Sequence, residues 1–167
     1  CECIEYTQPL SEMQYLKESG IRGELDFTTQ HVSRFNNELD REIYATAVKM
    51  LQEKGVKINY AKLEPRLQKH KNKDKFLNRF NVVDPDGCCH TIVAHIAMDG
   101  HYYIYPTPNP TIENARSITV REAARIQSFP DDYFFEGSRT AAFRQIGNAV
   151  PVMMSYNIAL SLLNQLE

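Results

Sequence analysis

Apolar residues recur every four positions after Ser33, which is the spacing of one face of a helix. The members of this stripe are Phe35, Leu39, Ile43, Ala47 and Leu51. The Ser33 hydroxyl can cap the start of such a helix, and Gly55 can end it. The pattern predicts a helix between these two residues. The preceding thirty residues show no long period, because Gly20 and Gly23 interrupt them, and they predict loops with short strands.

The middle of the chain predicts shorter elements. Lys57–Tyr60 is a candidate strand, and Glu64–His70 is a candidate helix. Thr91–Ile96 is rich in β-branched residues, and His101–Pro106 is rich in aromatic ones. Between them stands an Asp-Gly pair at 99–100, a dipeptide that tolerates the positive φ of tight turns. The pattern therefore predicts a β-hairpin that turns at this pair.

The C-terminal part of the chain predicts three helices. The stretch Thr119–Glu122 has the residues of a capping box and predicts a helix over Val120–Ser128. Ser138 can cap a second helix that runs into Gly147, and Pro151 suits the first turn of a third. The last helix is apolar and nearly free of charge, so it needs a surface to pack against. Together these elements predict an α+β fold with short β-hairpins and helices.

Composition narrows the class of protein. The 167 residues are 43% hydrophobic and 24% charged, which is ordinary for a soluble globular chain. No apolar stretch reaches the roughly 18 residues expected of a membrane span, and the N-terminus lacks the pattern of a secretory signal. The four cysteines form C-x-C and C-C pairs rather than C-x-x-C, so we expect reduced thiols in a cytoplasmic protein and no metal site.

The charge of the chain is unevenly distributed. The net charge is −2, yet residues 62–80 contain seven lysines and arginines and two acids, a local charge of +5. Such a segment is typical of a surface that contacts a polyanion. It is equally typical of a solvated helix-and-loop surface. Charge alone leaves both interpretations open.

Two stretches near the C-terminus resemble conserved blocks of the DNA cytosine-5 methyltransferase family. ITVREAARIQSFPDDYFFEGS (Ile118–Ser138) is similar to the ninth block of that family. RQIGNAVPVMM (Arg144–Met154) is similar to the tenth block, with Val152 in place of its second proline. Thr91-Ile92 matches the Thr-plus-aliphatic pair of the family's target-recognition domain, and Gln30–Asp40 resembles one bacterial branch. The order and spacing of these blocks make the resemblance specific.

Other signatures of the family do not occur in this sequence. It contains no G-x-G of the cofactor-binding loop, no Pro-Cys pair of the nucleophile and no Glu-Asn-Val. The resemblance therefore implies the C-terminal part of such an enzyme, inactive alone and without catalytic residues of its own. Residues 1–143 would form the target-recognition domain with the ninth block. Residues 144–167 would be the tenth-block segment and a helix that packs on the missing cofactor-binding domain.

The resemblance also implies partners and site residues. The partners would be double-stranded DNA with a flipped cytosine, S-adenosylmethionine as methyl donor, and the N-terminal catalytic region. No membrane partner is expected. The expected DNA-binding residues are Lys69, Lys71, Lys73, Lys75, Arg79, Thr91, Ile92 and Arg121. The expected cofactor-lining residues are Asn148, Ala149 and Val150. Arg121 has a second possible role, the orientation of loops.

Three hypotheses about the whole protein stay open at this point. The chain can belong to a bacterial restriction–modification or regulatory methyltransferase in the cytoplasm, associated with the nucleoid. It can instead be a stand-alone DNA-binding module, or a subunit of a split methyltransferase that acts in trans. If the cofactor-binding domain is absent, the C-terminal helix lacks its partner, and we expect it to dock on a neighbouring copy of the chain or back on its own domain.

Overall fold

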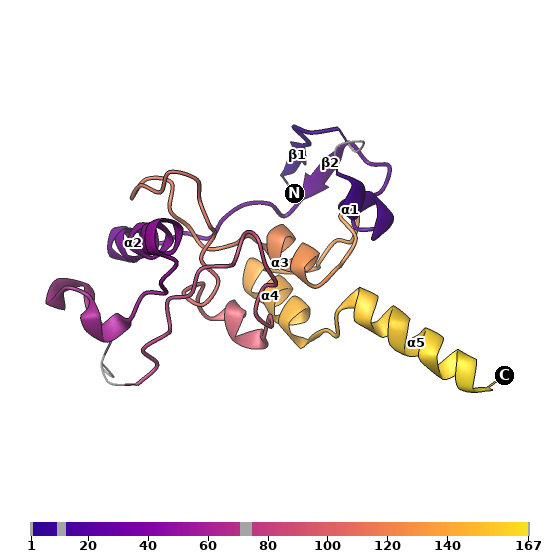
Figure 1. Cartoon of the computed structure of the whole chain (residues 1–167). Coiled ribbons are helices and arrows are strands. Elements are labelled where there is room, and N and C mark those ends of the chain that lie inside the picture. The colour runs from indigo at the N-terminus through magenta and orange to yellow at the C-terminus, as the bar shows by residue number, and fades with distance from the viewer. Residues whose placement is uncertain (1, 10–12, 71–74, 167) are drawn as a thin grey trace. The chain divides into compact units, whose positions relative to one another are not determined.

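The computed structural model describes residues 2–9, 13–70 and 75–166. The chain forms two compact units, each built from segments that are far apart in sequence. Unit 1 contains Cys1–Val32, Ile92–Ala97 and Thr119–Glu167, and unit 2 contains Ser33–Thr91 and Met98–Ile118. Helices, short strands and irregular segments are combined in the chain (Figure 1), which confirms the predicted α+β class.

Unit 1 joins a two-stranded sheet to several helices (Figure 1). Its strands and helices are β1 (Cys3–Glu5), α1 (Gln14–Glu18), β2 (Phe27–Thr29), the 3₁₀ helix Ala94–Ala97, α3 (Val120–Ile126), α4 (Arg139–Asn148) and α5 (Val152–Leu166). β1 and β2 are antiparallel, with Cys3 opposite Thr29. The capping box is confirmed, because the Glu122 amide donates to the Thr119 hydroxyl and the Thr119 amide donates to the Glu122 carboxylate. Ser138 caps α4 as expected.

Unit 2 is organised around α2 (Glu38–Lys54). This helix contributes Ile43, Tyr44, Ala47 and Val48 to a buried core. Ile104 is fully buried and forms a parallel bridge with Val82 and an antiparallel bridge with Ser117. These bridges give the described part of unit 2 a β-like centre without a regular sheet.

The predicted start of α2 is wrong by one turn. The helix begins at Glu38, where the Asn37 side chain accepts a hydrogen bond of 2.9 Å from the Asp40 amide. Asn37 has extended backbone, and its side-chain oxygen can reach the Asp40 amide. The first turn of a helix leaves such amides without an intrahelical acceptor, so Asn37 acts as the N-cap. Phe35 precedes the helix and is 85% exposed. The predicted end is confirmed, because Gly55 has a φ of 63° and closes the helix onto Leu51.

The elements predicted between α2 and the basic segment are also different. Lys57–Tyr60 is not a strand, and Glu64–His70 is not a continuous helix. Short 3₁₀ helices at Tyr60–Lys62 and Pro65–Leu67 replace them. The second one ends early, and the His70 amide donates to the buried Tyr60 hydroxyl at 2.9 Å, so tertiary packing directs the backbone there.

The predicted hairpin does not form. The first expected strand contains the 3₁₀ helix Ala94–Ala97, whose Ile96 is buried in unit 1. In the second expected strand, His101–Pro106, the Ile104 amide donates to the Asn81 carbonyl. This aromatic segment therefore pairs with residues of unit 2 that are distant in sequence. Gly100 allows its backbone to lie close to Ser117, because a Cβ on Gly100 would be 2.4 Å from the Ser117 Cβ. Burial of the apolar residues in two separate cores therefore outweighs local pairing.

Candidate nucleic-acid interface and cofactor segment

The basic segment presents its lysines to solvent. Lys69 and Lys75 are exposed, whereas Lys71 and Lys73 lie outside the described residues. Arg79 is half-buried and stacks over the Tyr60 ring at 4.2 Å, a cation–π contact that fixes its guanidinium. Arg66 is paired with the carboxylates of Glu42 and Glu64. Since Arg66 is paired with carboxylates, Lys62, Lys69, Lys75 and Arg79 are the other described cations of the segment that contribute positive potential.

A cluster of aromatic and histidine side chains supports this segment. The Tyr44 hydroxyl lies 2.7 Å from His101 Nδ1, and the Tyr60 hydroxyl lies 3.1 Å from His70 Nδ1. The two histidine rings are 5.7 Å apart, and Phe80 contacts both of them. Burial lowers the pKa of His70, and the charge of Arg79 and the neighbouring His101 lower it further. The neutral imidazole is therefore the form that this cluster favours.

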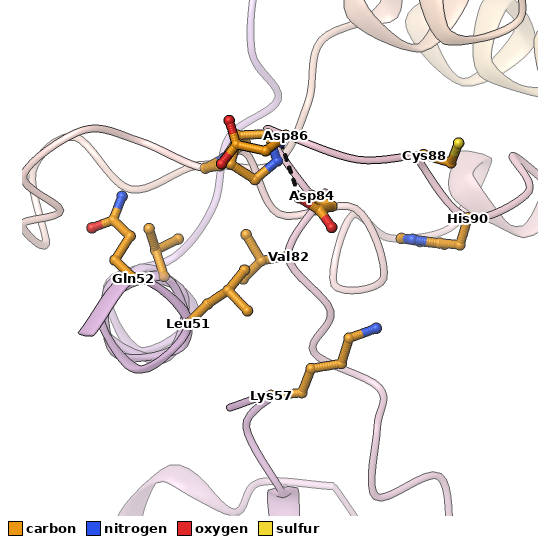
Figure 2. A pocket seen from close by; sticks show the side chains of 11 residues that line it. Leu51, Gln52, Lys57, Val82, Asp84, Asp86, Cys88 and His90 are labelled. Carbon is orange, nitrogen blue, oxygen red and sulfur yellow. Dashed lines mark hydrogen bonds between the residues drawn. The ribbon is translucent and has the colours of Figure 1, made fainter. Parts of the chain in front are cut away.

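A cavity of about 520 Å³ opens in unit 2 between the end of α2 and the loop that follows Val82 (Figure 2). Leu51 and Val82 form part of its apolar wall, and Asp84 accepts a hydrogen bond from the Asp86 amide at 3.0 Å. His90 also lines it, with Nε2 2.6 Å from the Tyr102 carbonyl oxygen. Burial lowers the pKa of His90 against the effect of that hydrogen bond.

This cavity lacks the arrangement of a catalytic site among the described residues. Cys88 lines it but is exposed at the rim, and no histidine is recorded within hydrogen-bond reach of its thiol. Burial raises the pKa of the neighbouring Cys89 thiol to about 11, so this residue is a poor nucleophile.

Acidification from about pH 7.5 to about 5.5 is expected to lower the free energy of unfolding. The pKa values of His70 and His90 are lowered in the fold, whereas the unfolded chain takes up protons near the ordinary pKa of about 6.5. The stabilisation is therefore complete above that pKa and is lost as the pH falls through it. Urea unfolding across this range measures the slope. His70→Gln should flatten the slope, and an unchanged slope in this variant would contradict the assignment.

Thr91 and Ile92 have different environments although they are neighbours. Thr91 is exposed, and its carbonyl oxygen accepts a hydrogen bond of 2.9 Å from the Tyr103 hydroxyl in unit 2. Ile92 is the first residue of a segment of unit 1 and is 2% exposed. Of this pair, Thr91 presents its side chain to solvent, whereas the side chain of Ile92 is buried.

Arg121 is completely buried and is surrounded by backbone oxygens of unit 1. Its Nε donates to the Thr29 carbonyl at 3.0 Å, and its two terminal nitrogens donate to the carbonyls of Pro130 and Tyr133 at 2.9 and 2.8 Å. The Thr29 hydroxyl is a further partner at 3.3 Å. The arrangement supports the second role of Arg121, the orientation of loops, because it joins the segment at Thr29 to the turn at Pro130–Tyr133.

A second polar cluster in unit 1 was missed by the sequence interpretation. Asp131 is buried and accepts two hydrogen bonds from Arg125, at 2.8 and 2.6 Å. The Tyr6 hydroxyl is a third donor to it, at 2.5 Å. Burial alone would raise the pKa of Asp131, but the bonds from Arg125 and Tyr6 outweigh it and lower the pKa. The sequence separation between Asp131 and Arg125 follows no local pairing rule, and Tyr6 is 125 residues away.

The helix predicted to run from Ser138 into Gly147 is confirmed and ends one residue later. α4 runs through Gly147 to Asn148, and Ala149 rather than Asn148 is its C-cap. Asn148 and Val150 are exposed, and Ala149 is half-buried. The side chains of Asn148 and Val150 are therefore open to solvent, and the Asn148 amide is the polar group among the three. They do not enclose a ligand by themselves.

α5 follows this segment and has no buried residue. Val152–Leu166 contains no Asp, Glu, Lys or Arg, and eight of its ten apolar side chains are large. By length and composition alone, Arg139–Leu166 would pass as a membrane span among the described residues. That range combines α4, which contributes buried residues to unit 1, with α5, and Ala149–Pro151 interrupts it. α5 by itself has 15 residues, fewer than the roughly 20 that cross a bilayer.

Comparisons with known proteins show which family the chain is similar to. The model of the family described as C-5 cytosine-specific DNA methylase matches residues 6–164. Type II methyltransferase M.Bpa9945I of Bacillus paralicheniformis is 53% identical over 131 residues, 78% of this chain and 28% of that protein. Putative type II methyltransferase M.OihORF3336P of Oceanobacillus iheyensis is 36% identical over 130 residues, 74% of this chain and 27% of that protein. The chain thus spans about a quarter of the length of these curated relatives.

Proposed function

The chain belongs to the C-5 cytosine-specific DNA methylase family, and from this membership we propose that it is the C-terminal part of a bacterial DNA cytosine-5 methyltransferase. One observation carries the proposal: the family match covers residues 6–164, while the sequence contains no Pro-Cys pair and no G-x-G loop. The nucleophile and most of the cofactor pocket would lie on another segment. The chain would be inactive alone and would act in the cytoplasm, at the nucleoid.

Unit 2 would provide the DNA-reading surface. Lys69 and Lys75 are exposed and Arg79 is held by Tyr60, so these three cations suit contacts with phosphates. Base edges in the major groove would be read by neighbouring polar groups, for which the rim of the cavity offers the carboxylates of Asp84 and Asp86. A carboxylate can accept from the amino group of cytosine but repels phosphate, so its place would be in the groove.

Unit 1 would provide one wall for S-adenosylmethionine. The exposed amide of Asn148 and the small surface of Ala149 and Val150 fit contact with one side of such a molecule. The cofactor, when bound, supplies the methyl group. The described residues of this chain would hold and orient it, and Thr91 would lie near the backbone of a flipped nucleotide.

α5 would pack on the catalytic region of the same enzyme. Its apolar side chains are exposed, and it carries no charge to favour solvent. The stand-alone module and the split subunit remain the alternatives. Bisulfite mapping of DNA from cells that carry the full-length gene tests the main proposal, because protected cytosines at one sequence are expected. Tight duplex binding by the isolated chain without any methylation would support the module instead.

Replacing Lys69, Lys75 and Arg79 by alanine together is expected to weaken duplex binding uniformly across DNA sequences. Each phosphate contact that is lost should make the slope of log K against log salt concentration shallower by about 0.9. Fluorescence anisotropy between about 50 and 200 mM salt measures this slope. Lys49→Ala is the matched control, because Lys49 is an exposed lysine of α2 outside the basic segment. An unchanged slope in the triple variant would place the DNA on another surface.

A further inference from the structure

Gly147 lies against the backbone of another segment of unit 1. A Cβ on Gly147 would be 2.5 Å from the carbonyl carbon of Val93 and 2.5 Å from the nitrogen of Ala94. Gly147 is helical, and its φ is not among the positive values of the described glycines. A glycine inside a helix costs about 1 kcal/mol relative to alanine. Its role here is therefore close approach rather than backbone freedom.

Gln127, the C-cap residue of α3, contacts the same segment. The side chain is 5% exposed, and its Nε2 donates to the Ile146 carbonyl at 3.0 Å and to the Ala149 carbonyl at 3.2 Å. The Gln127 carbonyl accepts from the Val152 amide at 3.1 Å. Helix ends leave backbone groups without intrahelical partners, and Gln127 contacts three backbone groups here, although the Ile146 carbonyl also accepts from the Ala149 amide. The last turn of α4 and the first of α5 are thus attached to α3.

These contacts connect the two sides of the proposed reaction. Val93 and Ala94 follow directly after Thr91-Ile92, the pair assigned to the flipped nucleotide. Asn148 follows directly after Gly147 and begins the cofactor-lining wall. Within unit 1, the backbone that leads to the base is therefore in direct contact with the helix that leads to the methyl donor.

We propose that Gly147 and Gln127 are positioning residues for methyl transfer. Gly147 sets the separation between the base-side segment Ile92–Ala94 and the cofactor-side segment Asn148–Val150, and Gln127 sets the direction of the latter. Neither residue needs to touch DNA or cofactor for this role. The inference rests on the proposed function, because the two segments matter only if base and methyl donor meet between them.

The size of the expected effect follows from the distances. Ordinary contacts of a Cβ begin at 3.4 Å, so Gly147→Ala must move the two segments apart by about 1 Å. A misplacement of that size can cost on the order of 100-fold in rate. Gln127→Met keeps the length of the side chain but removes both donors. It is expected to raise the KM for the methyl donor about tenfold while the Kd for duplex DNA stays within about threefold.

The test uses the full-length enzyme and four measurements: the single-turnover rate of methyl transfer, the KM for S-adenosylmethionine, the Kd for duplex DNA and the melting temperature. Gly23→Ala is the matched control, because a Cβ there meets nothing within 4 Å and its φ is not positive. It should transfer methyl groups like the wild type. Simple destabilisation would reduce the amount of active enzyme without changing the KM for the donor.

A folded Gly147→Ala variant that transfers at more than about one third of the wild-type rate would overturn the role of Gly147. An unchanged KM for S-adenosylmethionine in Gln127→Met would overturn the role of Gln127. This test of Gln127 does not depend on whether Gly147→Ala folds. If the wild-type enzyme and Gly23→Ala both fail to methylate DNA, the proposed function itself is wrong. If both methylate DNA and only the expected effects of Gly147→Ala and Gln127→Met are missing, the positioning roles alone are wrong.

Discussion

Arg121→Met is expected to lower the free energy of unfolding by about 3–5 kcal/mol, the largest effect on stability of any single change considered for this chain. Arg121 is fully buried, and its guanidinium donates to the carbonyls of Thr29, Pro130 and Tyr133. Methionine fills a similar volume but donates to none of them. A carbonyl that loses its donor where water cannot replace it costs about 1–3 kcal/mol. Urea unfolding followed by circular dichroism measures the loss.

The same experiment separates the two roles considered for Arg121. The matched control is Arg144→Met, which removes an exposed arginine of α4 and should change the free energy of unfolding by no more than about 0.5 kcal/mol. If Arg121→Met leaves stability intact but makes the salt dependence of DNA binding shallower, Arg121 is a phosphate contact and its loop-holding role is refuted.

Leu162→Asp combined with Leu163→Asp is expected to abolish methylation by the full-length enzyme, by on the order of 100-fold or more. Both leucines are more than half exposed in this chain, so neither has a partner surface among the described residues. If α5 packs on the catalytic region, the two carboxylates would be buried there without partners, which is far more costly than leaving them in water. Methylation of a plasmid in vivo and by the purified enzyme measures the effect.

The control for α5 adds the same charge to its other face. Asn157 and Asn164 are seven positions apart and lie on one side of the helix with Ser161. Asn157→Asp with Asn164→Asp should preserve activity within about threefold. In the isolated chain the leucine double variant should keep the stability of the wild type, because no residue of α5 is buried, and should abolish self-association. A wild-type chain that is monomeric with α5 ordered in solution would contradict a docking role.

Much of unit 1 follows from local sequence signals. The capping box at Thr119 and Glu122, the Ser138 cap and the glycine stop at Gly55 in unit 2 were all predicted and are all observed. Each depends on side chains that satisfy backbone groups three or four residues away, so the sequence alone specifies them. The family was also identified from the ninth and tenth blocks and is confirmed by the match over residues 6–164. The predicted domain boundary between residues 143 and 144 stays a prediction.

The elements that failed depend on distant partners. The segment Thr91–Ile96 has the composition of a strand, yet it contains a 3₁₀ helix because Ile92 and Ile96 are buried in unit 1. The aromatic segment after Gly100 pairs through Ile104 with Val82 and Ser117 in unit 2. An Asp-Gly pair indicates only that a tight turn is possible at that position. It does not indicate in which core the flanking apolar residues are buried.

The sequence by itself determined the family, the α+β class, the helix caps, the basic segment and the apolar last helix, since these depend on residue order and short-range chemistry. Only the tertiary structure decided the roles of individual residues. It buried Arg121 among backbone oxygens, paired Asp131 with Arg125 and Tyr6, and placed Gly147 against Ala94. These roles come from contacts between segments far apart in the chain, and no spacing rule encodes them, because the free energy of burial depends on which surfaces meet.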